Sequence, residues 1–147
     1  MTPEPAIGMA LPERRHDCDV VQQMLYNASL WNGHRIHFDM PYATEVEGYQ
    51  GLVVAGPLLG DWLHQIVDEW LDDAGMITGI EYSNRIAAFV GETVTAGGTV
   101  TQYDPNSGAL TLEVFESTRT YIPASLLGKN KENVLPPRHK YRLHSLY

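Results

Sequence analysis

The sequence predicts an α+β domain in which a curled antiparallel sheet wraps around one long apolar helix. The chain has 147 residues, of which 44% are hydrophobic, and this suits one domain with a core. Between residues 58 and 71, apolar side chains recur in pairs every four residues, a pattern typical of a helix with a wide buried face. Beyond Ile77 the pattern changes to alternation, which is typical of strands. One long helix followed by antiparallel strands indicates a layered α+β architecture.

The chain before the long helix is expected to be mostly irregular. Residues 1–11 are rich in Pro and Gly and predict an irregular segment. Asp17 or Asp19 can cap a short helix. That helix carries the apolar residues Val20, Val21, Met24 and Leu25. Residues 27–39 are dense in Asn, His and Gly, which favours a loop that carries side-chain chemistry.

The long helix has clear start and stop signals. It opens at Gly56-Pro57, with Pro57 at the first helical position, where the missing N–H costs nothing. Its apolar residues are Leu58, Leu59, Trp62, Leu63, Ile66, Val67, Trp70 and Leu71. Gly75 is predicted as its C-cap. Because the apolar stripe is wide, we expect the rest of the chain to wrap most of this helix.

Strands are predicted in the second half of the chain. Apolar and polar residues alternate from Ile77 to Ile86, and residues 93–103 are rich in Thr and Val, which favour strands. Residues 104–108 have turn chemistry, and apolar alternation resumes at Leu110. We therefore predict two or three antiparallel strands with a tight hairpin. A curled open sheet leaves exposed edges, which such domains usually cover by pairing with a second copy.

Net charge argues against nucleic acid as a partner. Ten basic and 18 acidic residues give a formal charge of −8, which disfavours a groove for polyanions. Residues 129–147 hold five basic residues and one acidic residue, whereas the remainder holds five basic and 17 acidic ones. We predict a single domain over residues 1–128 and a basic C-terminal tail over residues 129–147. This tail either folds back, is a mobile terminus, or contacts phosphates or a partner subunit.

Composition and segment lengths predict a soluble, cytoplasmic protein. The uncharged apolar stretch at residues 48–60 is too short and too broken by Gly and Pro to cross a membrane. Residues 1–15 lack the apolar region of a secretory signal. Cys18 is the only cysteine, which excludes an internal disulfide framework and a cysteine-rich zinc site.

Residues 32–39 are the strongest candidate for chemistry. Two of the six histidines, His34 and His37, lie three residues apart, with an amide before them and a carboxylate after them. Histidine is the side chain best suited to proton transfer near neutral pH. His34, His37 and Asp39 can also be metal ligands, and both histidines can equally be hydrogen-bonding loop residues. The other histidines add no ligand pattern, and we predict no metal site and no cofactor.

A second candidate segment, residues 48–57, leads into the long helix. Free backbone N–H groups and the positive end of the helix dipole meet there. Such a point can stabilise a carbonyl oxygen as it becomes an oxyanion. Since Pro57 has no N–H, the donors would be Gly56 and Leu58. The alternative is that Gly56 serves close packing between loop and helix.

Placed together, the two segments resemble a known family. Residues 32–42 read NGHRIHFDMPY, and residues 46–58 read VEGYQGLVVAGPL. They resemble the MaoC-like hydratases and dehydratases, in particular the branch related to mitochondrial 3-hydroxyacyl-thioester dehydratases and mesaconyl- or itaconyl-CoA hydratases. The resemblance extends over residues 7–114, and two separate motifs in order make it fairly specific. It implies a hot-dog fold and the hydration of 2-enoyl thioesters or the reverse dehydration of 3-hydroxyacyl thioesters.

The resemblance also implies residue roles. A typical family loop, Asp-x-Asn-Pro-x-His, places its His on His37, its Asp on Asn32 and its Asn on His34. Because a carboxamide cannot accept a proton at neutral pH, two mechanisms stay open. Either His37 acts alone while Asn32 positions the water, or His34 takes the vacated role. Gly56 corresponds to the glycine whose N–H binds the thioester oxygen. The predicted substrate-binding residues are Arg35, Val54, Ala55 and Leu58.

The resemblance implies an acyl-CoA or acyl-carrier-protein substrate and a homodimer or a hetero-oligomer with another hot-dog chain. The acidic body disfavours an acidic carrier protein, so CoA is favoured, and Arg35, Arg85 or the basic tail would meet its phosphates. Two other functions stay open. Asn32 in place of Asp fits a non-catalytic partner subunit of a heteromeric hydratase. A thioesterase would require a carboxylate near the helix, for which Asp61 and Glu47 are the candidates.

Overall fold

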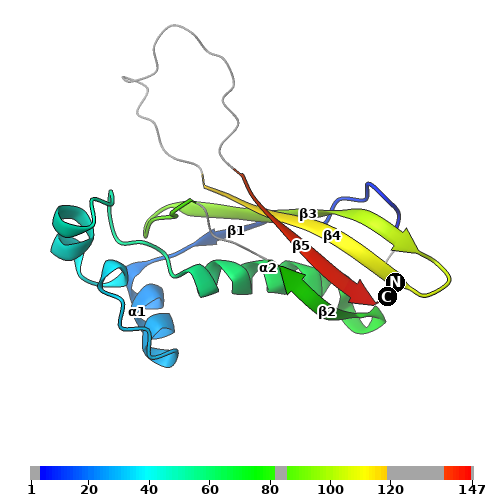
Figure 1. The fold of residues 1–147 in the computed structure, drawn as a ribbon, viewed down its shortest axis with the longest axis horizontal. Helices are drawn as coiled ribbons and strands as arrows, with labels where there is room; N and C mark the ends of the chain where they lie inside the picture. The colour runs from blue at the N-terminus through cyan, green and yellow to red at the C-terminus, as the bar shows by residue number, and fades with distance from the viewer. Residues whose placement is uncertain (1–3, 82–85, 119–137, 147) are drawn as a thin grey trace, which may run out of the picture.

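A curved sheet and the helix that it encloses make up most of the structure, which is a computed structural model (Figure 1). It describes residues 4–81, 86–118 and 138–146. Its strands and α-helices are β1 (Arg14–Asp17), α1 (Val20–Ser29), α2 (Gly56–Leu71), β2 (Met76–Glu81), β3 (Thr93–Asp104), β4 (Ala109–Thr118) and β5 (Arg138–Leu146).

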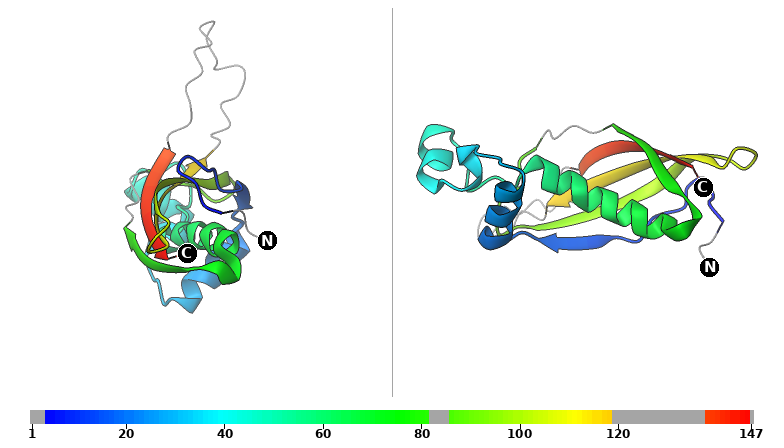
Figure 2. Two further views of the ribbon diagram at one scale, coloured as in Figure 1. Left: turned by 90° about the vertical axis from the view of Figure 1, so that its right-hand side faces the viewer. Right: turned by 90° about the horizontal axis from the view of Figure 1, so that it is seen from below.

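The sheet is antiparallel, and its strand order is β1-β3-β4-β5-β2. Two perpendicular views show that it curls around α2 (Figure 2). α1 and the loop that follows it lie beyond the N-terminal end of α2 (Figure 2). The predicted α+β hot-dog fold is therefore confirmed, with five strands among the described residues rather than two or three.

The apolar stripe of α2 forms the centre of the core. All eight predicted apolar positions of the helix are buried, and Pro57 lies in its first turn as predicted. Leu63 and Val67 are fully buried and pack in one cluster with Val100 and Leu112 of the sheet. Among the described residues, no helix has both the length and the hydropathy that crossing a membrane requires.

Truncating Leu63 is expected to destabilise the fold strongly. Because its side chain is 0% exposed and lies between helix and sheet, Leu63→Ala should lower the free energy of unfolding by about 2–5 kcal/mol. Urea denaturation followed by circular dichroism measures this loss. The matched control is Gln65→Ala, an exposed position of the same helix, which should change stability by less than about 0.5 kcal/mol. Equal stabilities of the two variants would show that the α2–sheet core is wrongly placed.

The helix ends in two steps. The C-cap of α2 itself is Asp72, with φ of 49° and ψ of −141°, and the predicted cap, Gly75, ends the 3₁₀ turn that continues the helix. This turn, Asp72–Ala74, leads into β2.

Part of the predicted basic tail folds back onto the sheet, which is one of the alternatives that the sequence left open. Residues 138–146 form β5, which pairs with β4 on one side and with β2 on the other. Because β5 joins β2 to the rest of the sheet, it is an integral strand of the domain. The predicted boundary at residues 128 and 129 lies outside the described residues.

The segment before α2 is more ordered than predicted. Of the two predicted N-caps, Asp17 and Asp19, it is Asp19 that caps α1. Its side chain accepts hydrogen bonds from the N–H groups of Val21 and Gln22. The predicted loop at residues 27–39 begins inside α1 and contains a 3₁₀ turn, Arg35–His37. This turn positions His37.

Candidate active site

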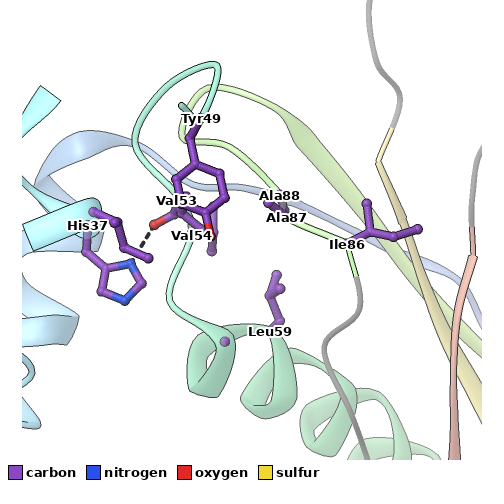
Figure 3. Close-up of a pocket in the computed structure, with 10 residues that line it drawn as sticks. His37, Tyr49, Val53, Val54, Leu59, Ile86, Ala87 and Ala88 are labelled. Atoms are coloured by element: carbon purple, nitrogen blue, oxygen red, sulfur yellow. Dashed lines mark hydrogen bonds between the residues drawn. The ribbon is translucent and has the colours of Figure 1, made fainter. Parts of the chain in front are cut away.

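A cavity of about 350 Å³ lies where the segment leading into α2 meets the His37 turn. Figure 3 shows His37 on one side of it, Ala88 and Ile86 on the opposite side, and the first turn of α2 below. The lining residues are Ile36, His37, Tyr49, Val53, Val54, Gly56, Leu59, Ile86, Ala87 and Ala88. The two principal predicted residues, His37 and Gly56, therefore line one cavity although 19 positions separate them in the sequence.

His37 is buried and held in one tautomer. Its Nδ1 lies 2.7 Å from the carbonyl oxygen of Val53. Because a carbonyl can only accept a hydrogen bond, Nδ1 carries the proton and Nε2 keeps its lone pair. Burial lowers the pKa of His37; the Val53 hydrogen bond opposes this shift and the nearby His34 adds to it. A neutral imidazole with a free lone pair is the form that can accept a proton.

The tautomer and the titration of His37 can be tested directly. At neutral pH we expect the proton on Nδ1, and a pKa below the ordinary value of about 6.5 because burial disfavours the imidazolium. Long-range ¹H–¹⁵N spectra across the acidic range measure both, with His37→Ala assigning the signal. Since the unfolded chain binds this proton more readily, the free energy of unfolding should also decrease as pH falls below about 6.5. A proton on Nε2 at neutral pH would contradict the geometry.

Gly56 supplies the only unoccupied N–H where the chain enters α2, within the part of the chain that the structure describes. The Val54 N–H donates to Ala88 O at 2.8 Å, and the Ala55 N–H donates to Gln23 Oε1 at 3.3 Å. The Leu58 N–H donates to Ala55 O at 2.9 Å, so the predicted second donor is already engaged. Because Gly56 begins α2, its N–H lies at the positive end of the helix dipole.

The other predicted substrate-binding residues around the helix start differ in their positions. Val54 lines the cavity. Ala55 and Leu58 are buried next to it in the core cluster that also contains Trp62, and they are not lining residues. Their contribution is to support the wall of the cavity.

Asn32 is not brought to the cavity. Its Nδ2 donates to Asn27 Oδ1 at 2.7 Å, and its Oδ1 accepts from the His34 N–H at 3.2 Å. Both ends of the carboxamide therefore hold the loop together. Asn32 instead lines a separate hollow, together with Asn27, Ala28, Trp31 and Gly33.

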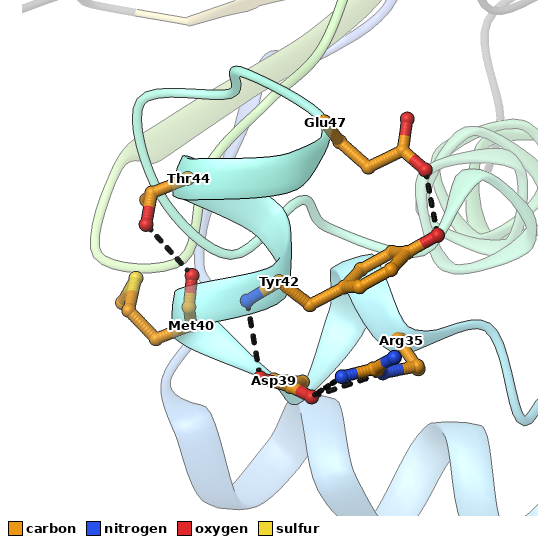
Figure 4. A network of polar contacts seen from close by, with 6 residues as sticks. All are labelled: Arg35, Asp39, Met40, Tyr42, Thr44 and Glu47. Carbon is orange, nitrogen blue, oxygen red and sulfur yellow. Dashed lines mark hydrogen bonds and ion pairs between the residues drawn. The ribbon is translucent and has the colours of Figure 1, made fainter.

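His34 and Arg35 lie outside the cavity as well. The exposed His34 ring lies edge-on to the His37 ring, with 5.7 Å between centroids. Arg35 pairs with Asp39 at 2.7 Å and stacks over the ring of Tyr42 at 4.1 Å (Figure 4). Hydrogen bonds from Arg35 lower the pKa of Asp39. Arg35 is thus already paired with a carboxylate, and Arg85 lies outside the described residues.

Carboxylates are absent from the described lining of the cavity. Asp61 is exposed and accepts a hydrogen bond from the Tyr26 hydroxyl at 2.6 Å, while Glu47 accepts one from Tyr42 at 2.8 Å. Across the described ranges no group of three or more His, Cys, Asp or Glu side chains is arranged to hold a metal ion. The chemistry available at this site is an imidazole, a backbone N–H and an apolar cavity.

A comparison with protein families decides what kind of protein this is. The sequence model of the family described as Htd2, hydroxyacyl-thioester dehydratase type 2, matches residues 11–90, which is more than half of the chain. The chain belongs to this hydroxyacyl-thioester dehydratase family. The match contains β1, α1, the His37 turn and α2, and so it covers the whole segment that carries the candidate site.

Known proteins resemble the chain in part of its sequence and in its fold. A mesaconyl-C(4)-CoA hydratase from Chloroflexus aurantiacus is 51% identical over 41 residues, which are 28% of this chain and 15% of that hydratase. The (R)-hydratase from A. caviae involved in PHA biosynthesis has a TM-score of 0.79 at 16% identity, and 97% of each chain is covered. The ChsH1–ChsH2 complex from Mycobacterium tuberculosis has a TM-score of 0.74 at 18% identity, with 96% of each chain covered. At these identities the solved structures support the hot-dog fold.

Some residues of the site were not predicted. Tyr49 lines the cavity from the segment that leads into α2. Ile86–Ala88 line it because the β-bridge between Val53 and Phe89 holds this later part of the chain beside the helix start. Gln23, which shares the Val53 carbonyl oxygen with His37, was also missed. Apart from the Cys18 thiol, which lies 3.8 Å from Oε1, the partners of its amide are 14 to 32 positions away, so local sequence gives little signal for it.

Proposed function

We propose that this chain catalyses the reversible hydration of a 2-enoyl-CoA to a 3-hydroxyacyl-CoA, with His37 as the acid–base residue and the Gly56 N–H as the oxyanion donor. The observation that carries the proposal is that a neutral imidazole and an unoccupied helix-terminal N–H line the same cavity. Membership in a hydroxyacyl-thioester dehydratase family supports the reaction class.

The reaction follows from these two groups. The Gly56 N–H, aided by the α2 dipole, binds the thioester carbonyl oxygen and stabilises the enolate that develops on it. His37 Nε2 removes a proton from water as the water oxygen bonds to C3. The imidazolium then returns a proton to C2, and the enolate collapses to the thioester, so that one water molecule has been added across the double bond. Asn32 takes no part in these reaction steps, since both ends of its amide form hydrogen bonds within the loop.

The cavity lining indicates the part of the substrate that it holds. Apart from His37, Tyr49 and Gly56, the lining side chains are aliphatic, which suits the acyl group of a thioester. The net charge of −8 favours CoA over an acidic carrier protein. The CoA arm would then extend from the mouth of the cavity.

Hydration by the purified chain tests the proposal. With a panel of 2-enoyl-CoAs of increasing acyl length, we expect loss of the absorbance of the conjugated thioester with at least one substrate. A parallel thiol-release assay should stay negative, because the described cavity lining offers no carboxylate to drive hydrolysis. Release of free CoA without hydration would instead identify a thioesterase.

A second candidate function is a non-catalytic partner subunit of a heteromeric hot-dog hydratase. It is supported by Asn32 at the position of the family's Asp and by similarity to a two-component complex. Half-exposed apolar residues on α1, together with the 95% exposed Trp31, support assembly with a second hot-dog chain. If the chain alone is inactive and hydration appears only on addition of a second hot-dog chain whose own histidine is required, this second function is correct.

A further inference from the structure

Gln23 is the most deeply buried polar side chain near the candidate site. α1 faces the interior with two polar residues, Gln23 and Asn27, whereas its apolar residues are half exposed. The side chain of Gln23 is 0% exposed. Burying an amide in this way is unfavourable unless its groups are hydrogen-bonded, so the position demands specific partners.

The amide of Gln23 contacts both halves of the site. Its Nε2 donates to Val53 O at 2.5 Å, and the same oxygen accepts the Nδ1–H of His37 at 2.7 Å. Its Nε2 also lies 3.4 Å from His37 O. At the other end of the amide, Oε1 accepts the N–H of Ala55 at 3.3 Å. Ala55 directly precedes Gly56.

We propose that Gln23 is a positioning residue that fixes the His37 imidazole relative to the Gly56 N–H. The N–H end holds the carbonyl that selects the His37 tautomer, and the carbonyl end holds the residue that aims the Gly56 N–H. Because an amide is planar, one side chain sets the separation of the base and the oxyanion donor. This inference rests on the proposed function, in which these two groups act on one substrate.

The proposed reaction requires a fixed distance between the base and the oxyanion donor. His37 lies on a 3₁₀ turn and Gly56 on the first turn of a helix, so a contact between these two elements is needed to fix that distance. A misplacement of about 1 Å can lower the rate about 10²-fold. Gln23 does not line the cavity, so its loss should affect the chemical step more than substrate binding.

Two substitutions separate positioning from general packing. Gln23→Met removes both hydrogen-bonding ends, and we expect kcat to fall about 10–100-fold while KM changes little. Gln23→Glu keeps an acceptor for the Ala55 N–H but loses both donors. It also places a carboxylate beside the oxygen that His37 contacts, which favours the imidazolium. In Gln23→Glu the acid limb of the pH profile of kcat/KM should therefore move to higher pH.

The matched control is Gln22→Glu, the same chemical change at the exposed neighbouring position of α1. It should leave kcat and the pH profile unchanged. Circular dichroism and thermal unfolding establish that each variant is folded. If folded Gln23→Met and Gln23→Glu both retain wild-type kcat and an unshifted acid limb, the positioning role is wrong, while the proposed function stands on the activity of the wild type.

An NMR titration of His37 keeps the two proposals distinguishable. If the wild-type chain hydrates no 2-enoyl-CoA, the proposed function fails, but the titration still tests the link between Gln23 and His37. A higher pKa of His37 in Gln23→Glu supports it. Identical His37 signals and titrations in the wild type and both Gln23 variants overturn it.

Discussion

Replacing His37 by Ala should lower kcat/KM for 2-enoyl-CoA hydration by about 10²–10⁴-fold, the usual contribution of a positioned acid–base group. The imidazole is the only side chain in the described cavity lining that can exchange a proton near neutral pH. The fold should persist, because Val53 O keeps its hydrogen bond from Gln23 when the imidazole is removed. Steady-state kinetics with the substrate that the wild type prefers measure the effect.

The matched control for this substitution is His64→Ala. His64 lies on α2, bonds Gly60 O and does not line the cavity, so its removal should leave hydration intact. His34→Ala distinguishes the two mechanisms that the sequence left open, because it should reduce hydration only if His34 takes the role of the family's Asp. If His34→Ala rather than His37→Ala abolishes activity, the exposed ring is the base and the assignment of His37 is wrong.

The second large effect is expected from Gly56→Pro, which should lower kcat by about 10²–10³-fold, the cost of removing one oxyanion donor. Proline is tolerated in the first helical turn, where no intrahelical bond uses the N–H. Ala55 is already extended, with φ of −60° and ψ of 125°, as a residue before proline prefers. The substitution therefore removes the N–H without breaking α2.

Gly56→Ala separates the loss of the N–H from the effect of added atoms. It retains the donor and reports the steric cost of a side chain in the cavity wall. The ratio of kcat between Gly56→Ala and Gly56→Pro then measures the contribution of the N–H. Equal kcat values for the two folded variants would exclude an oxyanion role for Gly56.

The helices could be predicted because their signals are local. The paired apolar residues of α2, its Pro57 and the Asp19 cap of α1 act within a few positions of one another. The β3–β4 hairpin was equally clear, since its turn chemistry lies between two alternating segments. These are the elements for which pattern and structure agree.

The two strands that were not predicted, β1 and β5, have polar or basic sequences that are not typical of strands. β1, Arg-Arg-His-Asp, is polar and lies at an edge of the sheet. It pairs with β3 through its backbone and through Asp17, which accepts a hydrogen bond from the Thr93 hydroxyl. β5 carries basic residues at positions 138, 140 and 142, which made it resemble a solvated tail. Its place between β4 and β2 depends on partners that are distant in the sequence. Long-range pairing of this kind leaves little trace in local pattern.

The contrast between local signals and long-range contacts also applies to the residues of the site. His37 and Gly56 could be singled out because they belong to two motifs that resemble those of a known family, and both line the cavity. Asn32 was placed in the catalytic set by alignment with the family loop, yet its amide is used to close that loop. Gln23 was missed because a buried amide gives no periodic signal, and the backbone groups that its amide joins are distant in the sequence.

The most direct test of the account is a crystal structure of the chain with a saturated acyl-CoA, which has no double bond to hydrate. We expect the acyl group in the cavity, the thioester oxygen within hydrogen-bonding distance of the Gly56 N–H, and C3 beside Nε2 of His37. An acyl group bound in the cavity with its thioester oxygen away from Gly56 and C3 away from His37 would contradict the account, as would binding of the acyl group elsewhere on the chain.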